Sequence, residues 1–401
     1  MAGGRASSRP AVDEVRERVI AFLSERVRRD PEDMVALNRL AGEYLGRYRQ
    51  SGDDGDLLKS QAMAEQSLKS VPESENPGGL AARARARFAL HHFAEAREMG
   101  LRLVQYDPDK RYPLEILGDA ELELGDYDAA EATYRKVESM GEADVNSETR
   151  LARLALVRGR RDEARERFAK SVAMARDILP AAPQVVTWCL VQGGQLAFGS
   201  GDWESAEKQY LEALKECPQD WGAIDHLAEL RGAQKRYDEA IGLYTALVMR
   251  VPRPELYQAL GDLCAAAGKA GDAAGWRRKA LAGYLATVAA GGIQYDHHLA
   301  GFFCDSAPNP AQALKWAKKD LAARQSVYAW DGLAWALYQS GQFKPAAEAM
   351  DKALAQGTQD SHLLYHASLI YYRAGDAAKG KACLLKAGQV NPKFNEFHVH
   401  R

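Results

Sequence analysis

The chain has 401 residues, of which 46% are hydrophobic and 27% charged, and this balance predicts a folded chain and excludes a disordered one. Its 53 basic and 55 acidic side chains leave a formal net charge of −2, so no global basic field attracts phosphate backbones and a primary nucleic-acid role is disfavoured. No run approaches the roughly 18 apolar residues that a membrane-spanning helix needs, so no membrane span is expected.

The N-terminal segment, residues 1–11, is mostly Gly, Ala, Ser and Arg and is expected to be a flexible tail. It has no apolar stretch of the kind found in signal peptides, which favours a cytoplasmic location. An exported or periplasmic location is the alternative if an export signal is missing from this sequence. Residues 12–29 then predict a single amphipathic helix that caps the rest, with its apolar face formed by Val15, Val19, Phe22 and Leu23.

From about residue 31 to residue 392, small and large apolar residues recur in phase. Alanines stand 34 residues apart at positions 96, 130 and 164, and again at 206 and 240, with an aromatic residue four positions after most of them. The clearest unit begins at residue 327 and contains Trp330, Leu333, Ala334, Leu337, Gly341, Phe343, Ala346, Met350 and Ala353. A period of this length predicts repeated helical hairpins, in which alanines lie where the two helices approach most closely.

This pattern resembles the tetratricopeptide repeat family, and the chain is similar to the long multi-repeat bacterial members of that family. The resemblance implies an all-α fold, a right-handed superhelical solenoid of about ten helical hairpins over residues 12–392, followed by a C-terminal tail at residues 393–401. Hairpins are predicted to start near residues 34, 77, 111, 145, 187, 221, 254, 293, 327 and 361. In such an array each unit is expected to contact only its neighbours, which spreads stability along the chain.

Three steps in the array exceed 34 residues and indicate insertions. The first is interpreted as a Gly/Asp-rich loop at residues 51–60. The second is interpreted as a helix prolonged to about residue 179. The third places a turn containing Gly291 and Gly292 between two units. Each is a candidate kink in the superhelix.

The resemblance further implies that the first helix of each hairpin lines a concave groove. At those positions the middle of the array is acidic and the C-terminal third is aromatic. Aromatic residues on a concave surface are typical of binding hot spots. The candidate partner-binding residues are Asp225, Glu229, Asp262, His297, Tyr328, Asp331, Trp335, Tyr338, His362, Tyr365 and Tyr372. In the same register, His366 is predicted to lean toward the hairpin interior.

No motif indicates catalytic chemistry, and we expect no catalytic residue, no metal site and no cofactor. His297, His298 and Asp305 lack the spacing of a zinc protease and are interpreted as packed or surface residues. The five cysteines form no Cys-x-x-Cys pair and are interpreted as small apolar fillers. The Arg-rich residues 150–170 are interleaved with glutamates, which indicates a helix surface with ion pairs more than an RNA-binding stripe.

The sequence thus favours a non-enzymatic scaffold or adaptor that binds a peptide or protein partner in its groove. One alternative is a carbohydrate or small-ligand module that uses the aromatic C-terminal groove, and another is an enzyme with an unfamiliar site around His297 and Asp331. The aromatic tail after Pro392 is expected to fold against the last hairpin. Otherwise it lies in the groove or joins two copies into a homo-oligomer.

Overall fold

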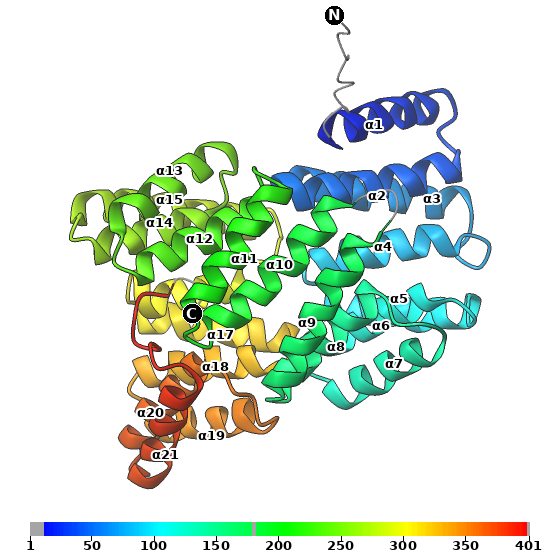
Figure 1. Cartoon of the computed structure of the whole chain (residues 1–401). Coiled ribbons are helices and arrows are strands. Elements are labelled where there is room, and N and C mark those ends of the chain that lie inside the picture. The colour runs from blue at the N-terminus through cyan, green and yellow to red at the C-terminus, as the bar shows by residue number, and fades with distance from the viewer. Residues whose placement is uncertain (1–11, 179–181, 399–401) are drawn as a thin grey trace, which may run out of the picture.

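The computed structural model describes residues 12–178 and 182–398, so the expected N-terminal tail lies outside the described residues. Within these ranges the chain folds into α-helices and one short π-helical turn, with no strand. A lone helix, α1 (Val12–Arg29), precedes ten helical hairpins. The predicted all-α solenoid is therefore confirmed, and Figure 1 shows the hairpins stacked in chain order.

The helices pair consecutively through the described residues. The pairs are α2 (Met34–Ser51) with α3 (Asp54–Ser70), α4 (Pro77–Ala89) with α5 (Phe93–Tyr106), α6 (Arg111–Leu124) with α7 (Tyr127–Ser139), α8 (Val145–Val157) with α9 (Arg161–Arg176), α10 (Pro183–Phe198) with α11 (Trp203–Glu216), α12 (Trp221–Ala233) with α13 (Tyr237–Arg250), α14 (Pro254–Ala266) with α15 (Ala270–Ala289), α16 (Asp296–Gly301) and the π-helical turn η1 (Phe302–Ser306) with α17 (Pro310–Ala323), α18 (Val327–Gln339) with α19 (Phe343–Leu354), and α20 (Ser361–Ala374) with α21 (Ala377–Val390).

Several boundaries differ from the sequence-based interpretation. Residues 51–60 do not form a loop, because α2 runs to Ser51 and α3 begins at Asp54. Gly52, at φ 69°, ends α2 in the left-handed conformation, and the Asp53 side chain caps α3 by accepting a hydrogen bond from the Gly55 backbone. Two residues therefore suffice for the turn.

The other two insertions also differ in detail. Helix α9 ends at Arg176, before residue 179, and α10 begins at Pro183, earlier than the expected residue 187. Proline suits the first turn of a helix, where its missing N–H costs nothing. Helix α16 begins at Asp296, after the turn that contains Gly291 and Gly292, and not at residue 293.

In several hairpins a tyrosine of the second helix is buried against the first helix. Tyr134, Tyr210, Tyr244 and Tyr284 come from second helices and are at most 1% exposed. Tyr134 and Tyr210 lie so close to glycines 118 and 194 of the partner helices that a Cβ there would overlap the tyrosine ring. The glycines thus permit the close approach of the two helices that the repeat pattern predicted.

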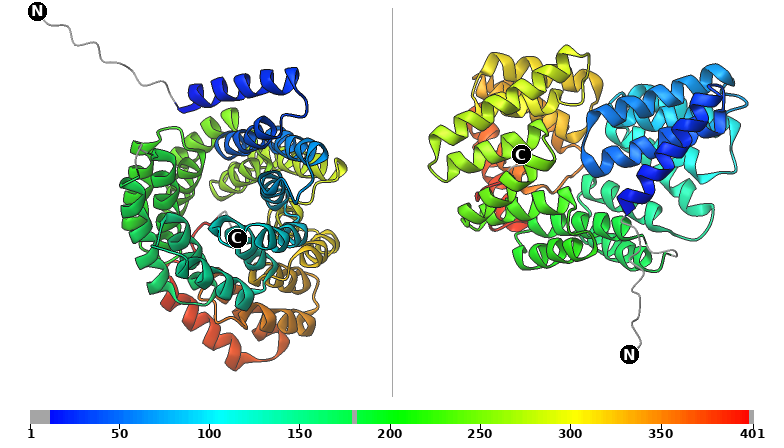
Figure 2. Two further views of the ribbon diagram at one scale, coloured as in Figure 1. Left: turned by 90° about the vertical axis from the view of Figure 1, so that its right-hand side faces the viewer. Right: turned by 90° about the horizontal axis from the view of Figure 1, so that it is seen from above.

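The superhelix closes on itself after about six hairpins. The Val327 backbone N–H donates to the Tyr127 hydroxyl (2.8 Å), and the Gln325 backbone N–H donates to the carbonyl of Leu124 (3.0 Å). One hairpin further on, Arg161 donates to the carbonyl of Gln359 (2.7 Å). The residues joined by these side-chain bonds are 198 to 200 apart in sequence. The expectation that units contact only their neighbours is therefore wrong, because one superhelical turn packs directly on the next. Figure 2 (left) shows the resulting ring.

The same contact recurs in register along the chain. The turn inside a hairpin meets the loop that precedes the hairpin six units later, as at Gly125 against Gln325 and Gly159 against Gly357. Gly125 and Gly159 both have positive φ, and a Cβ on either would overlap the carbonyl oxygen that faces it, that of Gln325 or Gly357. Glycine is required there twice over, by the backbone conformation and by the approach of the next superhelical turn.

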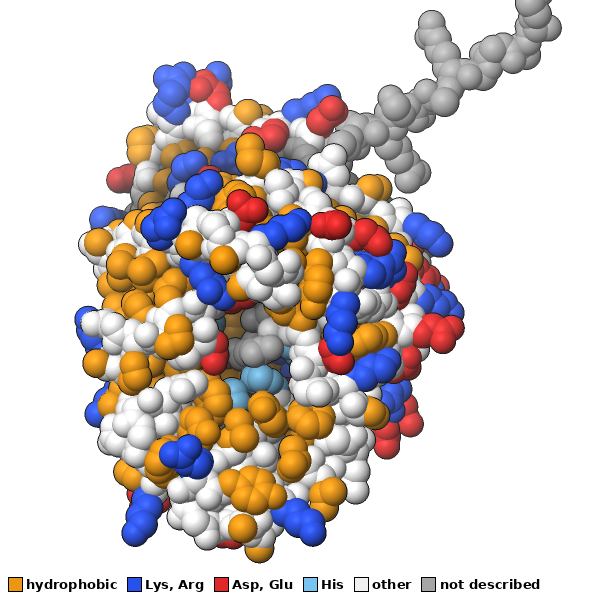
Figure 3. Space-filling model, turned by 90° about the vertical axis from the view of Figure 1, so that its left-hand side faces the viewer, with side chains coloured by type: hydrophobic (Ala, Val, Ile, Leu, Met, Phe, Trp, Pro, Cys, Tyr) orange, Lys and Arg blue, Asp and Glu red, His pale blue; other side chains and the backbone are white. Residues whose placement is uncertain are grey.

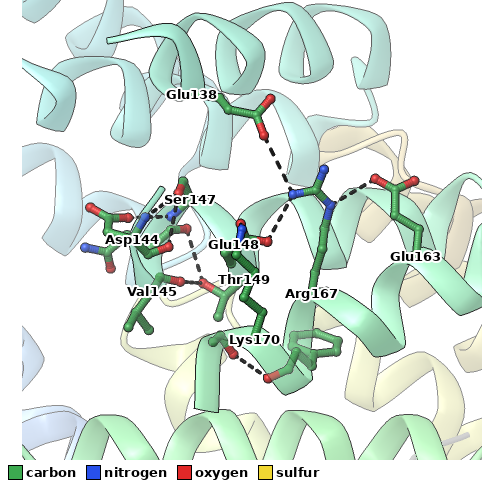
Figure 4. A network of polar contacts seen from close by, with 12 residues as sticks. Glu138, Asp144, Val145, Ser147, Glu148, Thr149, Glu163, Arg167 and Lys170 are labelled. Carbon is green, nitrogen blue, oxygen red and sulfur yellow. Dashed lines mark hydrogen bonds and ion pairs between the residues drawn. The ribbon is translucent and has the colours of Figure 1, made fainter. Parts of the chain in front are cut away.

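The Arg-rich stretch forms ion pairs that hold neighbouring helices together (Figure 4). The carboxylate of Glu148 is buried in α8, and it is bonded by Arg167 (3.1 Å) and Lys170 from α9. Arg167 also bonds Glu163 one helical turn away (2.9 Å) and approaches Glu138 of α7 (3.8 Å). This is the ion-paired helix surface that the interleaved charges predicted.

Candidate functional site

The helices are arranged in a ring around a central space, which we call the lumen (Figure 2, left). Figure 3 shows one face of the molecule hollowed at this point, with histidine side chains visible inside. In the wall of the lumen lies a cavity of about 330 Å³, lined by residues of α14, α16, η1, α17, α18 and α20. We call it the Trp335 cavity. Four of the predicted groove residues line it, namely His297 of α16 and Tyr328, Asp331 and Trp335 of α18.

A stack of three rings forms one side of the Trp335 cavity. The indole of Trp335 stacks on Tyr338 (centroids 4.9 Å apart, planes at 6°) and on His366 (4.0 Å, 10°). Trp335 and Tyr338 are three residues apart on α18 and so share a face of that helix, whereas His366 comes from α20. The indole N–H donates to Asp305 (3.1 Å), and Asp331 bonds Nδ1 of His366 (3.1 Å). The aromatic side chains are thereby held in one orientation.

His366 was predicted to lean into its hairpin, and this prediction is wrong. Its ring lines the cavity. The ring stacks on Trp335, and its Nδ1 is hydrogen-bonded to the Asp331 carboxylate. His362, four residues earlier, lies beside it with ring centroids 4.3 Å apart. The two histidines share one side of α20 because residues four apart are neighbours on a helix. That spacing was the signal in the sequence that could have placed both in the site.

A second histidine cluster joins the two superhelical turns at the cavity. The rings of His297 and His298 lie 4.0 Å apart, and His297 stacks on His91 from the turn between α4 and α5 (5.6 Å). Burial lowers the pKa of His91 to about 3, with further lowering by Arg324. Burial also lowers the pKa of His297 well below its usual value. Both imidazoles are therefore neutral at pH 7.

Two polar atoms at the Trp335 cavity have no hydrogen-bond partner among the described residues. They are Nδ1 of His297 and Oε2 of Glu255, and both are shielded from solvent. Glu255 bonds Arg253 through its other oxygen, and burial raises the pKa of the Glu255 carboxyl although Arg253 opposes that shift. Buried polar atoms are nearly always paired, so these two atoms make the Trp335 cavity a candidate binding site.

The acidic candidates of the middle region are engaged in internal contacts. Asp225 is 3% exposed and accepts a hydrogen bond from the Tyr244 hydroxyl (2.8 Å). Asp262 accepts hydrogen bonds from Arg277 (2.8 Å) and from Ser306 (2.7 Å). Their repeat register placed these carboxylates on a groove-facing row, but Tyr244 of α13 covers Asp225, and Arg277 of α15 and Ser306 of η1 bond the partly exposed Asp262.

Glu229, the third acidic candidate, is 1% exposed and binds the C-terminal segment of the chain. Its carboxylate lies 2.9 Å from Nδ1 of His398, and the other oxygen lies 3.3 Å from Nδ1 of His226. Glu229 is in α12, so the chain end has crossed the lumen from α21 to reach it.

The tail, residues 391–398, makes contacts along this crossing. The ring of Phe394 packs on Tyr365 of α20 (5.4 Å), and Phe397 packs into the apolar cluster of α12 and α14 beside Leu263. Glu396 pairs with Lys235 (3.3 Å). The tail therefore does not merely fold against the last hairpin, as was expected, but lies in the groove, because its two phenylalanines find apolar surface on opposite sides of the lumen.

Tyr372 is the predicted groove residue that lies apart from the others. Its ring covers Gly380 of α21 so closely that a Cβ there would overlap it. The remaining aromatic candidates fall into two groups, Tyr328 and Tyr338 at the Trp335 cavity and Tyr365 under the tail. The structure thus brings together most of the C-terminal candidates and separates them from the acidic ones.

Among the described residues, no helix has both the length and the apolarity that crossing a bilayer demands. The same residues contain no group of three or more His, Cys, Asp or Glu side chains arranged to hold a metal ion. The stacked histidines of the lumen are thus packed against aromatic and polar neighbours.

No curated protein sequence matches the chain. Similar solved structures include the human IFIT1 dimer with PPP-AAAA, at 12% identity over 94% of this chain and 94% of that one, with a TM-score of 0.48. Yeast Tom70 is 14% identical over 94% of this chain and 89% of its own, with a TM-score of 0.38. A tetratricopeptide repeat protein from Parabacteroides merdae is 16% identical over 61% of this chain and 93% of its own, with a TM-score of 0.42.

The family model described as the tetratricopeptide repeat matches residues 81–144 and 191–252. The first segment lies within α4 to α7, and the second runs from within α10 to the end of α13. The same helical hairpin continues through the described residues on either side of both segments. The chain is therefore a tetratricopeptide repeat protein.

Proposed function

We propose that the protein is a scaffold or adaptor that holds a segment of a partner protein inside its lumen. Tetratricopeptide repeats serve protein–protein interaction in general, and the finer assignment rests on one observation. The chain's own tail lies in the lumen as a short non-helical segment, anchored by Phe394, Phe397 and His398. The lumen thus has the size, apolar pockets and polar contacts that a peptide needs.

The contacts of the tail resemble those of a bound ligand. Phe394 packs on Tyr365, Phe397 packs on an apolar cluster, and His398 lies against a buried carboxylate, Glu229. Such anchors supply most of the binding energy in protein–peptide interfaces. A partner segment with similar anchors would compete with the tail for the same surface.

The carbohydrate alternative is less well supported by the site. A sugar binds best against broad exposed aromatic faces, but Tyr338 and His366 already stack on Trp335, and of the aromatic rings at this cavity only Tyr328 is more than half exposed. The enzyme alternative needs His297 and Asp331 to act together, whereas the Asp331 carboxylate bonds His366. Protein binding remains the function that the geometry favours.

The proposal is tested with a chain that ends at Val390 and a fluorescently labelled peptide of residues 391–401. The shortened chain should bind the peptide in an anisotropy titration, whereas the full chain should bind it much more weakly because its own tail competes. Replacing Phe397 by Ala in the peptide should cost about 2 kcal/mol, or about thirty-fold in affinity. A scrambled peptide is the matched control.

Circular dichroism of the shortened chain shows whether the solenoid stays folded. If its helical content is native and the peptide does not bind, or binds no better than the scrambled peptide, the lumen is not a peptide site and the proposal fails.

A further inference from the structure

We propose that the Trp335 cavity receives a cationic side chain, lysine or arginine, from the segment held in the lumen. This inference rests on the proposed function and deepens it by naming a chemical feature of the partner. It stands on the charge of the cavity wall, on two buried atoms that lack partners and on the aromatic surface beside them.

The charged groups at the cavity are mostly carboxylates. Four carboxylates and one guanidinium line it among the described residues, and they belong to Glu255, Asp305, Asp320, Asp331 and Arg324. The guanidinium of Arg324 is already bonded to Asp320 (3.0 Å) and approaches Glu123 (3.7 Å), and Glu255 is paired with Arg253 behind the wall. The four carboxylates still outnumber these two guanidinium groups. A neutral His297 adds no positive charge to offset the remaining carboxylates. The wall therefore favours a ligand with positive charge.

The two unpartnered atoms favour a ligand that donates hydrogen bonds. Oε2 of Glu255 can only accept when the carboxylate is ionised, and Nδ1 of His297 accepts in the neutral tautomer that carries its proton on Nε2. An ammonium or guanidinium group carries three to five N–H donors and no acceptor. A cationic side chain thus supplies both the charge and the donors that the cavity lacks.

The aromatic surface fits the stem of such a side chain. Tyr328 is 51% exposed and lines the cavity next to the Trp335 stack. Lysine and arginine bury their methylene stems on apolar surface, and their charged groups are attracted to aromatic faces. The cavity volume of about 330 Å³ lies at the low end of the roughly 300–1,000 Å³ seen for ligand pockets, which suits one side chain more than a whole ligand.

The described part of the tail, residues 391–398, passes beside this cavity without supplying a cation to it. His362 lies between the two, with its ring near both His366 of the cavity and His398 of the tail. The lysine of the tail, Lys393, instead lies over the ring of Trp203 at 3.9 Å. A partner segment with a basic residue at the right position would therefore make a contact that residues 391–398 do not make.

The test uses full-length protein and three small probes: N-acetyl-arginine amide, the neutral isostere N-acetyl-citrulline amide, and spermidine. Binding is followed by the NMR signal of the Trp335 indole N–H, which is assigned with Trp335→Phe. The arginine probe should shift this signal in a saturable way, and the citrulline probe should not. Spermidine is the probe for a free polyamine as the source of the cation.

Two substitutions remove negative charge at nearly constant shape, Glu255→Gln and Asp305→Asn. Each should weaken binding of the arginine probe by at least about five-fold, as expected for loss of a charge-assisted contact. Asp305→Asn keeps an oxygen for the Trp335 indole, so it covers the case in which Glu255→Gln disturbs folding around Arg253. Glu348→Gln, exposed on α19, is the matched control and should leave binding unchanged.

Equal shifts with the arginine and citrulline probes would overturn the inference, as would unchanged affinity in both charge variants. Binding of spermidine without binding of the arginine probe would assign the cavity to free polyamines and overturn the link to a partner segment. These results leave the tail-peptide titration unaffected, so failure of the cationic cavity is distinguishable from failure of peptide binding in the lumen.

Discussion

The contact between the two superhelical turns and the Trp335 cavity are built from different groups, backbone and glycines in the first and aromatic rings and carboxylates in the second. At the turn contact, backbone and side-chain groups bond each other directly, as between Gln325 and Leu124, and between Val327 and Tyr127. At the cavity, Nδ1 of His297 and Oε2 of Glu255 are buried without partners among the described residues. The first region joins the two turns of the ring, and the second is the surface that we propose binds a partner.

This comparison predicts that substitutions at the turn contact change stability, and that substitutions at the cavity change binding. The largest effect is expected for Gly125→Ala. Alanine at positive φ costs roughly 1–2 kcal/mol, and its Cβ would also overlap the Gln325 carbonyl, which adds a packing cost of about 1–3 kcal/mol. Urea unfolding should show a loss of about 3 kcal/mol.

Gly341→Ala is the matched control for that experiment. Gly341 also ends a first helix at positive φ, but nothing lies within 4 Å of its missing Cβ. The free energy of unfolding of the Gly341→Ala variant should fall only by the cost of placing alanine at positive φ, about 1 kcal/mol. Equal losses at Gly125 and Gly341 would mean that the superhelical turns do not touch in solution.

The pH dependence of stability provides a second test, at the point where the two regions meet. The folded-state pKa of His91, about 3, lies below its unfolded value near 6.5, so between these values the unfolded chain binds more protons. Stability should therefore fall as the pH drops from 7 to 5, by about 2 kcal/mol from His91. Burial also lowers the pKa of His297, which further reduces stability as the pH falls.

His91→Asn should flatten this pH dependence, because asparagine does not titrate and tolerates the φ of 64° at this position. The free energy of unfolding is measured at several pH values between 7 and 5 for both chains. An identical slope in the variant would show that the His91–His297 contact is absent or solvated.

The smallest effect on stability is expected at the cavity. Asp305→Asn keeps the acceptor for Trp335 at an exposed position, so the free energy of unfolding should change by no more than about 0.5 kcal/mol. The same variant is expected to weaken binding of a cation. A loss of stability comparable to that of Gly125→Ala would remove the distinction between the two regions.

The repeat pattern predicted the hairpins because it records contacts within and between adjacent units, such as Tyr134 against Gly118. It did not predict the closed ring. Closure depends on the angle between successive hairpins, which small changes such as the early start of α10 at Pro183 alter. The contacts that result are carried by backbone groups and glycines, whose role is not visible in the periodicity of apolar residues.

The candidate site could be predicted in part for a similar reason. The groove register located Trp335 and Asp331 correctly at one cavity, because both lie on the inner face of a single helix, α18. The same register wrongly predicted that His366 faces the hairpin interior and that Asp225 and Glu229 are exposed in the groove. The surroundings of these residues are set by side chains from other parts of the chain. Trp335 stacks on His366, Tyr244 bonds Asp225, and His398 of the tail lies against Glu229.

The most direct test of the central claim, that the lumen is a segment-binding surface held by the tail, is photo-crosslinking from residue 397. Benzoylphenylalanine replaces Phe397 in the full-length chain, and crosslinked peptides are identified by mass spectrometry. The structure predicts intramolecular crosslinks to α12 and α14, near Gly232 and Leu263. Crosslinks confined to α20 and α21, or covalent dimers in place of intramolecular products, would contradict it.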